Sequence, residues 1–136
     1  MKQGAKMDAA IAEAQRSNLT GEQLADLFSR IATMGYFMST VVGELHRGYL
    51  HAEAERKRYE AVTIIRSMAT GMSHAKAKSD MEGSKEHWER KDKEIDAEAE
   101  YQAMKLKLDS AKGVLQSLQM RLALLRDEAQ RTRVAA

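Results

Sequence analysis

An apolar repeat in the last third of the chain constrains the fold most. Its members follow one another at steps of four and three residues: Ala97, Tyr101, Met104, Leu108, Ala111, Leu115, Leu118, Leu122, Leu125 and Ala129. Such spacing over more than four heptads is typical of a helix that buries one face in a coiled coil. The chain also contains no proline, which is the residue most disruptive to a helix interior. The repeat therefore predicts a long helix over residues 84–130.

A second long helix is expected over residues 20–70. From Leu24 to Ala52 its apolar and small residues again alternate steps of four and three, which indicates one buried stripe. Thr20 and Gln23 have the spacing of a capping box, in which each side chain satisfies a backbone N–H group of the first turn. The start of this helix is thus fixed by a local signal.

Two shorter segments complete the prediction. Residues 5–17 are expected to form a short helix, and the glycines and small polar residues of 71–83 predict a loop. At 136 residues, the chain is at most one ordinary domain. We therefore expect a single all-α domain over residues 1–136: a long antiparallel, coiled-coil-like hairpin with a short N-terminal helix.

Apolar and small residues outside the repeats predict a homo-oligomer. A two-helix hairpin leaves Leu106, Val114 and Leu124 uncovered, so the short first helix or another subunit must cover them. Glycine is unfavourable inside a helix by about 1 kcal/mol relative to alanine, and its presence in the second helix suggests close approach by another backbone. The expected interface residues are Gly35, Ser39, Gly43, Leu106, Val114 and Leu124.

Opposite charges occupy the two arms next to the expected turn. Residues 56–78 carry six basic side chains and one acidic one, whereas residues 79–100 carry nine acidic and four basic ones. A turn near Ala77 would place Arg56 opposite Glu98 and Arg58 opposite Asp96. The basic block is then either one half of an interhelical charge match or a surface for a polyanion.

The polyanion interpretation involves eight basic or titratable residues. Lys76 and Lys78 are its strongest members because they lie in the expected turn, beyond the paired arms. Trp88, the only tryptophan, either stacks on a base or closes the hairpin tip against Arg66, and we favour closure. The full set of candidate nucleic-acid contacts is Arg56, Lys57, Arg58, Arg66, His74, Lys76, Lys78 and Lys85.

No pattern typical of an active site is found in the sequence. There is no cysteine and no glycine-rich phosphate loop, and His46, His51 and Glu55 lack the further ligands that zinc requires. The longest uncharged run, Ile31 to Gly43, has thirteen residues, short of the roughly 20 needed to span a membrane. We expect a non-enzymatic cytoplasmic protein without metal, cofactor, secretory signal or membrane contact.

The order of the elements resembles that of a known family. A short helix, a long helix with a basic middle and a break with Gly, Ser and Lys precede a helix that carries Asp96, Tyr101, Ala111, Leu115, Leu118 and Arg121. From about Leu24 to Glu128 this layout is similar to the UvsY-type recombination mediators of phages. The resemblance implies a ring-forming protein in the host cytoplasm that binds single-stranded DNA and helps to load a recombinase.

Two other functions stay open at this point. The charged tip or the apolar base could serve a protein-binding adaptor, or an inhibitor of a host enzyme of anti-phage defence. A purely structural coiled coil is the third possibility. Binding to DNA that weakens steeply with salt separates the first interpretation from the other two.

Overall fold

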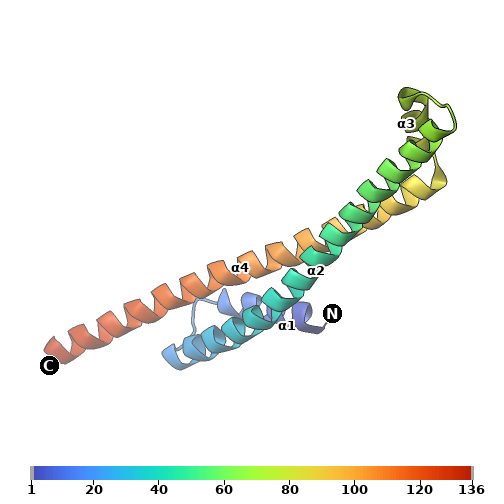
Figure 1. Cartoon of the computed structure of the whole chain (residues 1–136). Coiled ribbons are helices and arrows are strands. Elements are labelled where there is room, and N and C mark those ends of the chain that lie inside the picture. The colour runs from blue at the N-terminus through green and yellow to red at the C-terminus, as the bar shows by residue number, and fades with distance from the viewer. Residues whose placement is uncertain (1, 136) are drawn as a thin grey trace. The chain divides into compact units, whose positions relative to one another are not determined.

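Helices form almost the entire structure (Figure 1). The computed structural model describes residues 2–135, with side chains for residues 4–134. The helices are α1 (Lys2–Ala14), α2 (Gly21–Ala69), α3 (His74–Glu82) and α4 (Lys85–Ala135). Within this described part no β-strand occurs, so the all-α prediction is confirmed.

Side chains and a glycine fix the two ends of α2. At its start, the Thr20 N–H group donates to Gln23 Oε1 at 2.9 Å and the Gln23 N–H group donates to Thr20 Oγ1 at 3.2 Å. The predicted capping box is therefore confirmed. At its end, the N–H groups of Gly71 and Met72 bond back to the last turn, and Gly71 has a φ of +96°. This is a Schellman-type ending, which glycine adopts without steric cost.

The segment 71–83, expected to be a loop, contains helix α3. Ser73 accepts a hydrogen bond from the Lys76 N–H group at 3.3 Å and so caps the helix. Ala77 and Met81, four residues apart on one helical face, are both buried. The loop prediction was wrong here because small polar residues mark a helix cap as well as a loop.

The chain divides into two compact units, where the sequence analysis expected one domain. Unit 1 consists of Met1–Val41 and Met104–Ala136, and unit 2 consists of Val42–Ala103. Unit 1 therefore holds α1, the first part of α2 and the second part of α4. Unit 2 holds the rest of α2, α3 and the first part of α4.

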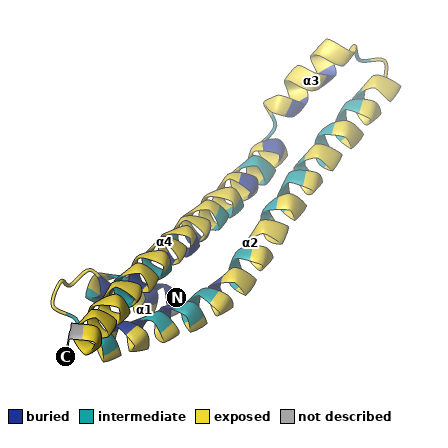
Figure 2. Ribbon diagram, turned by 90° about the vertical axis from the view of Figure 1, so that its left-hand side faces the viewer, coloured by how far each residue is buried: buried dark blue, intermediate teal, exposed yellow. Residues whose placement is uncertain are grey.

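Unit 1 is built from three helical segments around an apolar core (Figure 2). Arg121 fastens the end of α1, since its guanidinium donates to the carbonyl oxygens of Ala14 at 2.6 Å and Arg16 at 2.7 Å. These bonds satisfy carbonyl groups that a helix end leaves unpaired. The buried side chains come from all three segments: Met7, Ala10, Ala14, Leu24, Leu27, Ile31, Met38, Met104, Leu108, Ala111 and Leu118.

Unit 2 is an antiparallel hairpin, and α3 lies beside the end of α2 in both views (Figures 1 and 2). Arg56 contacts Glu94, not Glu98 as the expected pairing had it. The difference is one helical turn. Its cause is the position of the turn, which lies at residues 71–73 rather than near Ala77, because α3 already belongs to the returning arm.

Candidate functional site

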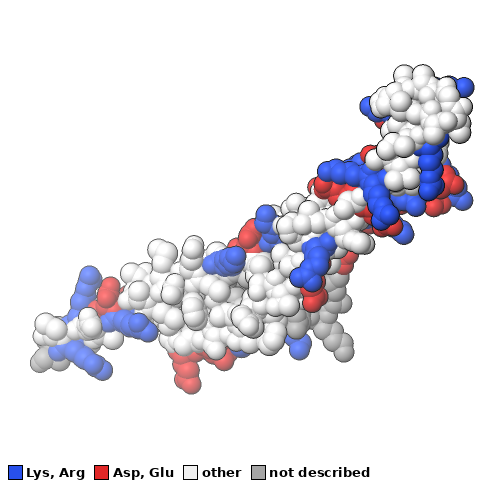
Figure 3. All heavy atoms as spheres, viewed as in Figure 1, with Lys and Arg blue, Asp and Glu red and all other residues white. Residues whose placement is uncertain are grey.

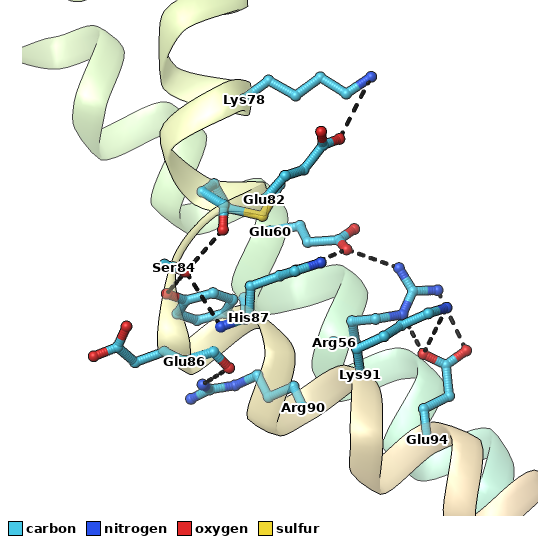
Figure 4. Close-up of polar contacts among 12 residues, drawn as sticks. Arg56, Glu60, Lys78, Glu82, Ser84, Glu86, His87, Arg90, Lys91 and Glu94 are labelled. Atoms are coloured by element: carbon cyan, nitrogen blue, oxygen red, sulfur yellow. Dashed lines mark hydrogen bonds and ion pairs between the residues drawn. The ribbon is translucent and has the colours of Figure 1, made fainter.

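Arg56, one of the predicted nucleic-acid contacts, belongs to a buried ion-pair cluster in unit 2 (Figure 4). Its Nε donates to Glu94 Oε2, its Nη2 to Glu94 Oε1 at 3.4 Å, and its Nη1 to Glu60 Oε1 at 2.9 Å. The side chains of Arg56 and Glu94 are only 15% and 7% exposed. Hydrogen bonding to Glu94 and then to Glu60 raises the pKa of Arg56. This guanidinium is therefore occupied internally and is not free to bind a phosphate.

His87 lies next to this cluster and is almost fully buried. Its Nδ1 lies 3.4 Å from Glu60 Oε1 but has no hydrogen-bond partner among the described residues. The His87 backbone N–H group donates to Ser84 Oγ at 3.2 Å, and Ser84 Oγ donates to the Met81 carbonyl at 2.7 Å. The cap of α4 thus places the imidazole against α2. Polar groups buried in this way favour one helix pairing over alternatives.

The sequence analysis missed Glu60, His87 and Glu94 as members of one cluster. A spacing signal was available, because Arg56 and Glu60 lie four residues apart and His87 and Glu94 lie seven apart. Both spacings return to the same face of a helix. Combining the two faces required the position of the turn, which the sequence analysis placed too far along the chain.

Three of the predicted lysines make ion pairs on the surface. Each pairs with the glutamate one helical turn away: Lys57 with Glu53 at 2.7 Å, Lys78 with Glu82 at 4.0 Å and Lys85 with Glu89 at 3.8 Å. Exposed pairs of this kind are worth about 0–1 kcal/mol. A ligand with stronger negative charge can therefore compete for these lysines.

The remaining predicted residues are exposed and unpaired. In the part of the chain that the structure describes, the side chains of Arg58, Arg66, His74 and Lys76 make no hydrogen bond or ion pair. The expected pairing of Arg58 with Asp96 is thus not formed. Figure 3 shows Lys and Arg side chains over unit 2, with Asp and Glu between them.

Exposed apolar side chains accompany these cations. On α2, Val62, Ile65 and Met68 are 37%, 66% and 44% exposed. Trp88, which we expected to close the tip against Arg66, is instead 54% exposed. Unit 2 therefore presents cationic and apolar groups on its surface, a combination found in proteins that bind single strands.

Unit 1 carries a long uncharged stripe on the outer side of α4. Its residues follow steps of four and three and are all exposed: Leu106, Ser110, Gly113, Ser117, Met120 and Leu124. Leu106 and Leu124, predicted interface residues, are 66% and 61% exposed. Figure 3 shows a broad area without charged side chains over unit 1. No segment of the described chain covers this stripe.

The other predicted interface residues have different surroundings. Val114 is half-buried beside the stripe, and Gly35 is half-buried within unit 1. A Cβ atom on Gly35 would meet Leu108 Cδ1 at an ordinary 3.9 Å, and one on Gly43 would meet nothing within 4 Å. Ser39 is exposed, and its hydroxyl bonds to the Tyr36 carbonyl. Close approach of another backbone at these positions is not seen within the chain and stays a prediction.

Metal and membrane sites were also sought. Among the described residues, no three His, Cys, Asp or Glu side chains are placed to hold a metal ion. Across the same residues, no helix is both long and apolar enough to cross a bilayer. The features that remain as candidates are the exposed cations of unit 2 and the outer stripe of α4.

Comparison with known proteins does not assign the chain to a family. No protein-family model, curated protein or solved structure matches it. Its function must therefore be argued from its own residues.

Proposed function

We propose that the protein is a non-enzymatic, homo-oligomeric accessory factor of DNA recombination that binds single-stranded DNA through unit 2. The observation that supports this best is the division of the basic block. Arg56 is occupied internally, whereas Arg58, Arg66, His74 and Lys76 are exposed without a partner among the described residues. Contacts to a phosphate backbone need accessible, spaced cations and little else.

The apolar side chains on the same unit favour a single strand over a duplex. Unpaired bases offer flat faces that can pack on apolar and aromatic groups, while the bases of a duplex are stacked on one another. Val62, Ile65 and Met68 are exposed on α2, the helix that carries Arg58 and Arg66. Cations for phosphates and apolar groups for bases thus occur together.

Homo-oligomerisation is supported by the outer stripe of α4, which is complementary to itself. Two copies related by a two-fold axis would place identical stripes against each other in opposite directions. Leu106 would then meet Leu124 of the second copy, Ser110 would meet Met120, and Gly113 would meet Ser117. Large side chains at the ends and small ones at the centre allow the two helices to approach closely.

The DNA-binding proposal is tested by fluorescence anisotropy with a labelled single-stranded oligonucleotide. We expect binding at 50 mM salt, with an affinity that falls steeply as salt is raised, by about 0.7 log units per log unit of salt for each phosphate neutralised. A matched unit 1 variant with Lys112→Gln, Arg126→Gln and Arg133→Gln should keep most of the affinity. Absence of binding at 50 mM salt would reject the proposal and favour a protein-binding adaptor or inhibitor.

The oligomer proposal is tested by light scattering combined with size-exclusion chromatography. The wild-type chain should elute as more than one subunit, and a Leu106→Glu, Leu124→Glu variant should elute as a monomer with unchanged helicity. Exposed side chains are replaced, so the fold of unit 1 should survive. A wild-type chain that is a monomer at micromolar concentration contradicts the proposal.

A further inference from the structure

Trp88 has an environment that sets it apart from the other aromatic residues of unit 2. It lies in the first turn of α4 and is 54% exposed. Its ring meets the His87 imidazole edge to face, with centroids 5.6 Å apart and planes at 76°. A contact of this geometry occupies at most one face of the indole, so a large aromatic surface stays open to a ligand.

The neighbouring aromatic rings are already engaged. The Arg90 guanidinium lies 4.1 Å from the centre of the Tyr59 ring. Tyr101 stacks on His46 at 4.6 Å and on Tyr49 at 6.3 Å. Among the described aromatic side chains of unit 2, Trp88 is therefore the exposed one that makes no stacked contact.

The support beneath Trp88 is fixed by buried groups. His87, against which the indole packs, is 8% exposed, and its backbone is held by the Ser84 cap. Ser84 Oγ also lies 3.4 Å from the Tyr59 hydroxyl on α2. A ring held in this way loses little freedom when a ligand stacks on it, which favours binding.

Cations lie on the same face of α4 as Trp88. Lys85 precedes it by three residues and Lys91 follows it by three, so both are its neighbours on the helix surface. The side chain of Lys85 is 86% exposed, and its pairing with Glu89 at 3.8 Å is weak. Asp92, four residues after Trp88, is the acid on this face. Two cations and one acid leave the surroundings of the indole positive.

From this geometry we propose that Trp88 is a stacking platform for one unpaired base of single-stranded DNA, with Lys85 contacting an adjoining phosphate. The inference rests on the proposed function and adds the residue that binds the base. Stacking on an indole accepts every base, because each base has a π-face. The site therefore contributes affinity without sequence preference.

The experiment uses the fact that Trp88 is the only tryptophan. Its intrinsic fluorescence is followed while the full-length protein is titrated with unlabelled oligothymidylate of about 16 nucleotides, in parallel with anisotropy of a labelled copy. We expect the emission to be quenched along the same binding curve as the anisotropy. Trp88→Ala should weaken binding about five- to 150-fold, and Trp88→Phe should lose less.

The salt dependence separates stacking from charge. Trp88→Ala should leave the salt slope unchanged, whereas Lys85→Gln should reduce it by about 0.7. Ile95→Ala, which removes an exposed apolar side chain two turns further along α4, is the matched control and should bind like wild type. Circular dichroism checks that each variant is folded.

The possible failures are distinguishable. Binding by anisotropy without quenching, or with full affinity in Trp88→Ala, would overturn the stacking role and leave the proposed function standing. Absence of binding at 50 mM salt would overturn both.

Discussion

Units 1 and 2 share two continuous helices but differ in what they bury. Unit 1 buries long apolar side chains such as Leu27, Ile31 and Leu118, whereas unit 2 buries Glu94 and His87 and few apolar groups. Burial of apolar surface stabilises by about 25 cal/mol per Å². A buried ion pair contributes little net stability, because desolvation offsets the attraction. One helix can therefore stabilise the fold in one unit and specify its pairing in the other.

The strongest test of this contrast is a cavity in unit 1. Leu118→Ala removes a side chain that is 1% exposed, and we expect the free energy of unfolding to fall by about 2–5 kcal/mol. Urea denaturation followed by circular dichroism measures the change. Val134→Ala, at a position 88% exposed on the same helix, should change stability by less than about 0.5 kcal/mol. Equal effects at the two positions would contradict the apolar core described for unit 1.

The corresponding test in unit 2 breaks the ion-pair cluster. Arg56→Met leaves Glu94 buried without its partner and should cost about 3 kcal/mol. A second change, Glu94→Leu, should recover much of this loss, since two apolar side chains then replace two charges. Lys57→Met, which removes only an exposed ion pair, should cost about 0–1 kcal/mol. If Glu94→Leu deepens the loss, the cluster stabilises unit 2 more than desolvation permits.

The turn between the arms of unit 2 gives a smaller effect. Gly71 has a φ of +96°, so Gly71→Ala places a Cβ atom in a left-handed conformation and should cost about 1–2 kcal/mol. Gly48→Ala is the matched control, because Gly48 lies inside α2 with no atom within 4 Å of an added Cβ. It should raise stability by up to about 1 kcal/mol. Thermal unfolding of both variants compares the two signs directly, and a neutral Gly71→Ala would argue against this turn.

The smallest predicted effect concerns a surface pair of unit 2 and its pH dependence. A hydrogen bond from Lys57, followed by one from Tyr49, lowers the pKa of Glu53 from its ordinary value of 4.5. The stabilisation is complete above 4.5 and is lost as pH falls through the lower pKa of the folded state. The stability difference between wild type and Glu53→Gln should thus be constant above about pH 5 and shrink in more acid solution. Denaturation at a series of pH values measures it, and a difference that persists in acid would refute the assignment.

Local signals made much of the fold predictable. The box formed by Thr20 and Gln23 involves residues three positions apart, and the apolar repeat of α4 needs only helical periodicity. The division of the basic block was different, because the partner of Arg56 depends on where the chain turns. Ser73 and Gly71 are local signals for that turn, but Gly83 is an equally strong one. The burial of Ala77 and Met81, which identifies α3, depends on tertiary packing and cannot be read from a short segment.

The central claim is that the fold divides the basic block into an internal arginine and an external set of cations. The most direct measurement compares the salt dependence of single-stranded DNA binding for two variants, each checked to be folded at the temperature used. A variant with Arg58→Gln, Arg66→Gln and Lys76→Gln should bind more weakly, with a salt slope shallower by about 2, whereas Arg56→Gln should keep the wild-type slope. A wild-type slope in the triple variant, or an equal loss in Arg56→Gln, would contradict the claim.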